Sequence, residues 1–184
     1  GEAGRGTLWR SYPEDARRSG VRKRLAWSFC RGRPMEGKYF LQLLAGGDNG
    51  KTLLFLMLTT AFPAWVKMSQ VDHLLRTRHG TNPNAAAEWK MDAMGARLLL
   101  LEEPIAGAVF DGALLKLLRG GGLMTGRNLY QHNVTYRPTY RVVISANTPI
   151  EVDPPDAAVL KSMHAYAMPS KFVEAGDPQL RPPP

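Results

Sequence analysis

The chain has 184 residues, of which 44% are hydrophobic, and a formal net charge of +8 at pH 7. This is enough chain for one domain with a substantial core. The single cysteine, Cys30, excludes an internal disulfide, and no apolar run approaches the roughly 18 residues of a membrane-spanning helix. We therefore expect an intracellular protein without a membrane partner.

The positive charge is concentrated near the N-terminus. Residues 1–38 contain ten of the 24 Lys and Arg residues but only four of the 16 acidic ones, so this segment carries +6 and the rest of the chain +2. Within it, residues 21–31 have the apolar spacing of a helix that ends before Pro34. Such a basic segment either contacts a polyanion or is a solvated leader, and both interpretations stay open.

The next elements form a strand, a glycine-rich turn and a helix. The apolar run 39–44 predicts a first core strand, and residues 51–62 predict a buried helix closed by Pro63. A second strand is expected at 64–69. Residues 73–82 are polar and contain glycine, which indicates a helix end followed by a loop.

The turn between the first strand and its helix has the composition of a phosphate-binding loop. Its glycines let the backbone curl around a phosphate with N–H groups pointing inward, and the helix adds its positive end. Lys51 would reach the β- and γ-phosphates of ATP, and the Thr52 hydroxyl would bind Mg²⁺. Ala45 stands where the usual pattern has glycine. Alternatively, this is a glycine-rich turn with a solvated Lys51. The candidate nucleotide-binding residues are Gly46, Gly47, Asp48, Asn49, Gly50, Lys51, Thr52 and Leu53.

The second half of the chain alternates between helix and strand patterns at crossover spacing. This alternation predicts an α/β fold with a largely parallel sheet. The expected elements are a helix at 84–94, a buried strand at 97–101, a helix at 110–119, a hairpin at 123–137 and a buried strand at 140–147.

Polar residues follow two of these strands. In a parallel sheet the ligand lies beyond the carboxyl ends of the strands, so Glu102 would hold Mg²⁺ while Glu103 would orient and deprotonate the attacking water. Asn147 would hydrogen-bond the γ-phosphate or that water. Taken singly, an acid pair is often a helix cap or a solvated turn, and Asn before Thr-Pro is a common turn residue.

Four sequence segments together resemble the ATPase domain of superfamily III helicases, in particular the primase–helicase proteins of large DNA viruses, phages and plasmids. The resemblance spans roughly residues 20–173. The segments are GGDNGKT (46–52), GARLLLLEEP (95–104), LLKLLRGGGLMTGRNLY (114–130) and YRPTYRVVISANTPI (136–150).

The resemblance implies an AAA+-like three-layer P-loop fold, a homo-hexameric ring, and ATP with Mg²⁺ driving movement along single-stranded or forked DNA. It points the hairpin at 123–137 into the central channel, which makes Arg127 and His132 candidate DNA contacts. Lys116 is grouped with them, as support for the nucleotide or the subunit interface. The arginine pair expected to reach a neighbour's ATP is replaced by Lys161-Ser162, so Lys161 is the candidate for that catalytic role.

We accordingly divide the chain into a basic segment (1–38), an ATPase core (39–173) and a Pro-rich tail (174–184), expected to be the end of a fragment. The preferred function is an ATP-dependent DNA helicase motor in replication, fused to or paired with a primase, in the host cytoplasm or at a viral replication site. The alternatives are a P-loop DNA-packaging or loading ATPase, or a nucleic-acid-binding module with weak or lost ATPase activity.

Overall fold

The computed structural model describes residues 39–76, 85–105, 107–127, 130–169 and 171–172. The basic segment 1–38 with its expected helix, and the tail 174–184, lie outside these residues. The elements in chain order are β1 (Phe40–Leu44), α2 (Lys51–Ala61), β2 (Val66–Gln70), the 3₁₀ helix η1 (Val71–Leu74), α3 (Ala85–Asp92), β3 (Leu98–Glu102), β4 (Val109–Asp111), α4 (Gly112–Gly120), β5 (Met124–Gly126), β6 (Val134–Tyr136), β7 (Arg141–Ala146), β8 (Glu151–Asp153), α5 (Ala157–Ser162) and β9 (Met163–Ala167).

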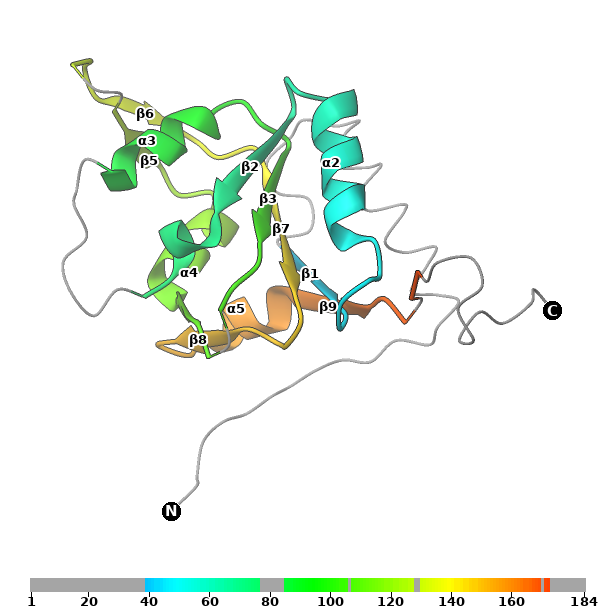
Figure 1. Ribbon diagram of the computed structural model, residues 1–184. Coiled ribbons are helices and arrows are strands. Elements are labelled where there is room, and N and C mark those ends of the chain that lie inside the picture. Colours follow the sequence, from blue (N-terminus) through cyan, green and yellow to red (C-terminus); the bar gives the residue numbers. More distant parts are fainter. Residues whose placement is uncertain (1–38, 77–84, 106, 128–129, 170, 173–184) are drawn as a thin grey trace.

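The centre of the molecule is a five-stranded sheet in the order β2-β3-β7-β1-β9, with every neighbouring pair parallel. Helix α2 covers one face of this sheet, and α3, α4 and α5 lie on the other (Figure 1). The predicted α/β fold with a mostly parallel sheet is therefore confirmed. Because the strands are parallel, the segments after β1, β3 and β7 all emerge at the same edge.

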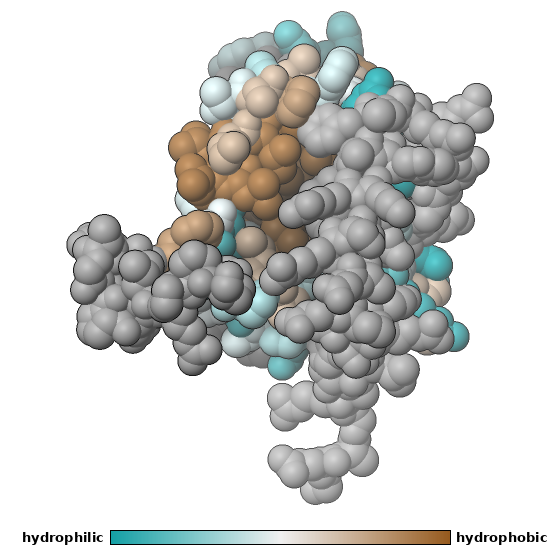
Figure 2. Space-filling model, turned by 90° about the vertical axis from the view of Figure 1, so that its right-hand side faces the viewer, coloured by the Kyte–Doolittle hydropathy of each residue, from teal (hydrophilic) through white to brown (hydrophobic). Residues whose placement is uncertain are grey.

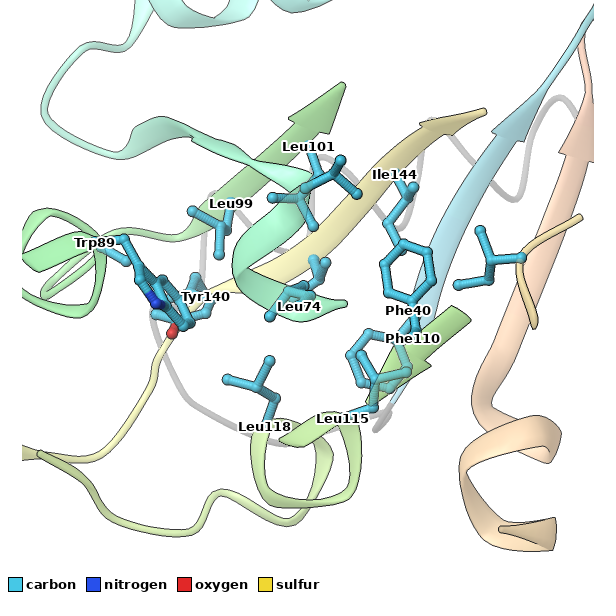
Figure 3. Close-up of a cluster of buried hydrophobic side chains, with 14 of the residues drawn as sticks. Phe40, Leu74, Trp89, Leu99, Leu101, Phe110, Leu115, Leu118, Tyr140 and Ile144 are labelled. Atoms are coloured by element: carbon cyan, nitrogen blue, oxygen red, sulfur yellow. The ribbon is translucent and has the colours of Figure 1, made fainter. Parts of the chain in front are cut away.

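Strand β3 shows why a continuous apolar run belongs in this sheet. Its alternate residues point to opposite faces: Leu98 and Leu100 join a cluster that includes Phe55 of α2. Leu99 and Leu101 join a larger cluster, which packs against α3, α4 and α5 (Figure 3). A strand that is covered on both faces needs apolar residues at every position, and all four leucines are at most 1% exposed.

Helix α2 is less buried than the sequence suggested. The helix itself is confirmed, but only Lys51 and Phe55 of its residues are buried. Leu53, Leu56 and Met57 are between 57% and 60% exposed, and Figure 2 shows apolar side chains gathered on this side of the molecule. The expectation of a buried helix was wrong because, among the described elements, α2 alone covers its face of the sheet.

The helix expected at 110–119 begins two residues later than predicted. Val109–Asp111 instead form strand β4, which pairs in parallel with β8. The Asp111 carboxylate accepts hydrogen bonds from the amides of Ala113 and Leu114, at 2.8 and 3.1 Å. Aspartate favours this capping position over the helix interior, and it therefore sets the start of α4.

Strands β8 and β9 and helix α5 were not expected from the sequence. Strand β9 belongs to the main sheet, where Leu41 of β1 lies opposite His164. Its sequence, MHAYA, contains one buried residue, Tyr166. An edge strand of this composition has neither a continuous apolar run nor a clean alternation, so no periodic pattern marked it.

The hairpin expected at 123–137 is confirmed. Strands β5 and β6 are antiparallel with Thr125 opposite Thr135, and their hydroxyl oxygens lie 2.9 Å apart. The Tyr136 hydroxyl donates a hydrogen bond to the Lys90 carbonyl of α3. The hairpin is thus fixed to the domain at its base, while Tyr130 near its tip has a left-handed φ of 62°.

Candidate nucleotide-binding site

The loop between β1 and α2 has a tightly folded backbone. Asp48 and Gly50 both adopt left-handed conformations, with φ of 57° and 75°. Asn49 is buried, and its amide donates hydrogen bonds to the carbonyls of Gly46 and Gly47. The Asn49 side chain therefore braces the loop from within, whereas Gly46, Gly47 and Asp48 are exposed on its surface.

Lys51, the first residue of α2, is only 6% exposed. Its ammonium group donates to the Ala45 carbonyl at 2.7 Å and to the Asn147 side-chain oxygen at 3.1 Å. A buried ammonium requires such acceptors because desolvation of the charge is costly. The lysine is thus enclosed by the loop and a strand end, and the alternative of a solvated Lys51 does not hold.

Asn147 connects this lysine to the next strand end. Its side-chain nitrogen donates a hydrogen bond to the Glu103 carboxylate, and both side chains are exposed. Lys51, Asn147 and Glu103 follow β1, β7 and β3, which are separate in sequence but aligned at one edge of the sheet. The structure therefore brings together the three catalytic candidates that were expected to meet.

Glu102 and Thr52 are the residues proposed to hold Mg²⁺. Glu102 ends β3, and its Oε1 atom is buried with no hydrogen-bond partner among the described residues. Thr52 is exposed in the first turn of α2. Buried polar atoms normally have a partner, so the orphaned oxygen fits a cation or its bound water. Among the described residues there is no cluster of three His, Cys, Asp or Glu side chains.

A cavity of about 570 Å³ adjoins Glu102 between β2 and α3. His73 lines this cavity, and its ring is stacked on Trp89 with the ring centroids 5.6 Å apart. The Nδ1 atom of His73 lies 3.0 Å from the Ser69 hydroxyl oxygen. Burial lowers the pKa of His73, although the nearby Asp72 carboxylate acts in the opposite direction. No sequence pattern marks this cavity, because its lining residues come from four separate elements, β2, η1, α3 and β3.

Lys161 and Ser162 end α5 in different environments. Lys161 is exposed, whereas Ser162 is 4% exposed and donates its hydroxyl to the Val159 carbonyl at 2.6 Å. Of this pair, Lys161 is the residue available to another molecule.

The candidate DNA contacts divide into two places. Arg127 and His132 are exposed on the hairpin, but Lys116 lies on α4, where it forms an ion pair with Asp156 at 2.9 Å. The hairpin also presents Tyr130, which is 97% exposed and which the sequence analysis did not select. An aromatic ring at a hairpin turn can stack on any base, and its place beside the predicted turn was the available signal.

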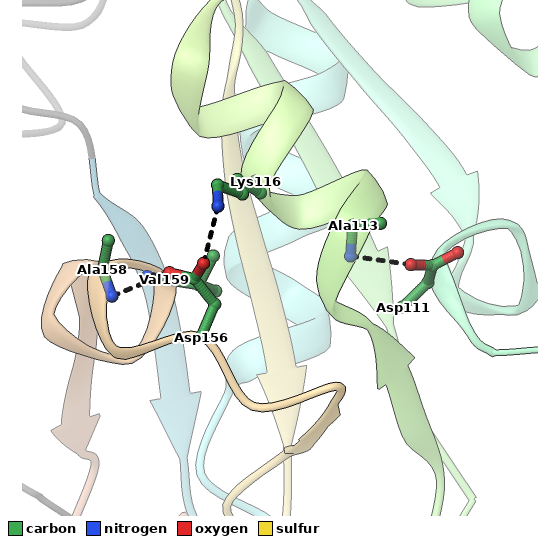
Figure 4. A network of polar contacts seen from close by, with 6 residues as sticks. All are labelled: Asp111, Ala113, Lys116, Asp156, Ala158 and Val159. Atoms are coloured by element: carbon green, nitrogen blue, oxygen red, sulfur yellow. Dashed lines mark hydrogen bonds and ion pairs between the residues drawn. The ribbon is translucent and has the colours of Figure 1, made fainter.

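The Lys116–Asp156 contact links α4 to the start of α5 (Figure 4). The Lys116 hydrogen bond lowers the pKa of Asp156 below its ordinary value of 3.8, helped by the amides of Val159 and Ala158. A carboxyl group whose pKa is lowered by folding contributes its full stability at pH values above its ordinary, unfolded-state pKa. That stability is lost as the pH falls through the folded-state pKa. We expect Lys116→Met to lower the denaturation midpoint modestly at pH 7, and progressively less below pH 3.8.

Asp156→Asn supplies the control, because asparagine still caps a helix but carries no charge. Denaturant titrations of both variants and of the double variant form a mutant cycle. In the Asp156→Asn background, Lys116→Met should have little further effect. A loss of stability that is equal at every pH would contradict an electrostatic role for Lys116.

No family model matches the chain. It is 24% identical over 135 residues to a protein named "Putative helicase L207/L206" from Acanthamoeba polyphaga mimivirus. The aligned region covers 73% of this chain and 14% of that protein. The chain thus spans about a seventh of the length of this relative.

Solved structures share the fold at lower identity. The A-form apo structure of the NrS-1 C-terminal region has a TM-score of 0.59 at 15% identity, covering 84% of this chain and 34% of that one. A JCV helicase structure has a TM-score of 0.51 at 12% identity, covering 82% of this chain and 40% of that one.

The fold and the strand-end residues define a P-loop NTPase-type domain. In sequence the chain is similar to a putative mimivirus helicase, and in fold to the NrS-1 C-terminal region and the JCV helicase, which supports the resemblance to superfamily III helicases.

Proposed function

We propose that this domain is an ATP-hydrolysing DNA helicase motor of viral type. The observation that carries the proposal is the continuous contact from Lys51 through Asn147 to Glu103. A cation, an amide and a carboxylate lie together beside a loop able to hold phosphates. Hydrolysis of a nucleoside triphosphate needs such groups in one place: positive charge for the phosphates and an acid for the attacking water.

In the proposed mechanism, the loop amides and Lys51 bind the phosphates, and Lys51 exchanges the Ala45 carbonyl for a phosphate oxygen. Thr52 and Glu102 would hold Mg²⁺, which neutralises charge on the β- and γ-phosphates when bound. Glu103 orients the water and accepts its proton. Asn147 contacts both Lys51 and Glu103, so its position would change when the γ-phosphate leaves.

A ring of identical subunits is part of the proposal. Lys161 is exposed at the end of α5, where it would act on the ATP of a neighbouring subunit. Lysine lacks the planar fork that lets arginine bind a phosphoryl group with two hydrogen bonds, so turnover should be slow for a motor of this type. In this proposal the motor also associates with a primase and acts at an intracellular replication site.

Two measurements on the purified chain test the function. ATP turnover with and without single-stranded DNA comes first, and stimulation by DNA supports a motor. Strand displacement on forked DNA then separates a helicase from a packaging or loading ATPase. DNA binding without detectable ATP binding would instead favour a nucleic-acid-binding module.

Arg127 tests the hairpin as the DNA-contacting element. Arg127→Ala should weaken binding to single strands about equally for all sequences, because a phosphate contact carries no base information. The slope of log affinity against log salt should fall by about 0.7, the value per lost contact. ATP hydrolysis without DNA should persist, while its stimulation by DNA should be lost.

Arg76→Ala is a matched control, because it removes the same charge from a side chain that pairs with Asp153 and lies outside the hairpin. DNA affinity should be nearly unchanged in this variant. If the two substitutions weaken binding equally, net charge explains the effect. If neither weakens it, the basic segment 1–38 becomes the better candidate.

A further inference from the structure

The chain that leaves β9 lies along the phosphate-binding loop. The Met168 amide donates to the Leu44 carbonyl at 2.8 Å, and the Phe172 amide donates to the Asp48 carbonyl at 2.6 Å. The Lys171 ammonium is 4.0 Å from the Asp48 carboxylate. Backbone contacts therefore hold Phe172 at the loop, four residues beyond Met168.

The Phe172 ring lies directly against Gly50. A side-chain carbon added to Gly50 would be 2.8 Å from the ring, and Gly50 also has a left-handed φ of 75°. The left-handed φ favours glycine at this position, whereas the exposed Phe172 ring could move away from an added carbon. Yet Phe172 is 67% exposed, so much of this aromatic residue remains open beside the loop.

The sheet order indicates which part of a nucleotide would meet this ring. The γ-phosphate end of the site is marked by Lys51, Asn147 and Glu103. Asn147 follows β7, and Glu103 follows β3. These strands lie on one side of β1, and β9 lies on the other (Figure 1). A triphosphate is a linear chain, so a nucleotide with its γ-phosphate at Asn147 would extend its sugar and base towards β9. Phe172 lies on that side.

We propose that Phe172 binds the base of the nucleoside triphosphate by stacking. This inference rests on the proposed function, because it assumes that the loop holds the phosphates. Stacking uses the face of the base and tolerates any base, although the larger purines gain more contact. Phe172 would therefore contact the base of the nucleotide and not its phosphates.

Comparing ATP with inorganic tripolyphosphate, which lacks a base, isolates this role. In calorimetric titrations of the full chain with Mg²⁺ present, Phe172→Ala should lower the affinity for ATP about 5- to 150-fold, the range for loss of one aromatic–base stack. Its affinity for tripolyphosphate should stay at the parent value. Phe172→Trp should retain ATP affinity, and its fluorescence should change with ATP but not with tripolyphosphate.

Phe62→Ala is the matched control. Phe62 is another partly exposed phenylalanine, 40% exposed and stacked on Trp65 at the other end of α2. This variant should bind both ligands as the parent does.

Three results would overturn the inference. Parent-like ATP affinity in Phe172→Ala shows that no stack exists. An equal loss for both ligands shows that Phe172 supports the loop, and a gain for both shows that it blocks the loop. An unmodified chain that binds neither ligand would overturn the proposed function itself, a result distinct from the other three.

Discussion

Lys51→Ala should reduce ATP affinity by about 100- to 10,000-fold and abolish turnover. The variant loses charge-assisted hydrogen bonds to two phosphates, each worth about 1.5–3 kcal/mol. Because Lys51 is buried and also bonds to Ala45 and Asn147, its removal leaves two acceptors without their donor. Lys51→Met is the better companion variant, since it fills the space without the charge.

Isothermal titration with ATP measures the loss, and circular dichroism checks that the fold remains. Lys67→Met on β2 controls for the removal of a partly buried lysine outside the loop. It should bind ATP as the parent does. ATP affinity at the parent level in both Lys51 variants would remove the phosphate-loop assignment.

The second large effect concerns Glu103. Glu103→Gln should leave ATP bound but slow its hydrolysis about 100- to 10,000-fold, the usual contribution of a general base. The amide oxygen can still accept the hydrogen bond from Asn147, so geometry is preserved while proton transfer is lost. Single-turnover hydrolysis, measured at saturating ATP, separates the chemical step from binding.

Glu102→Gln distinguishes the neighbouring acid. This variant should need more Mg²⁺ for half-maximal hydrolysis, because it weakens the proposed metal ligand. Normal turnover at ordinary Mg²⁺ in both the Glu102 and Glu103 variants would place the catalytic site elsewhere.

The central strands and the meeting of the catalytic candidates were predictable from sequence. Glycines followed by Lys51 and Thr52 mark the end of one strand, and an apolar run followed by Glu102 and Glu103 marks another. In a parallel sheet these ends must align, so local patterns were enough to bring Lys51, Glu103 and Asn147 to one edge.

The remaining features depend on contacts between distant segments. Strand β9 has a mixed composition, and its place beside β1 is set by pairing rather than by its own pattern. The position of Phe172 follows from β9 and was therefore hidden as well. Exposure of α2 was missed because its apolar sequence does not reveal how much of its surface another element covers.

Strand β7 links the candidate nucleotide site to the hairpin. It begins five residues after β6 ends and leads directly into Asn147, and it is paired with β1 and β3. Five of its six residues are buried. A strand of this length spans about 20 Å and contains no hinge. Because β1 and β3 hold the strand on both sides, β7 fixes the position of Asn147 relative to the base of the hairpin.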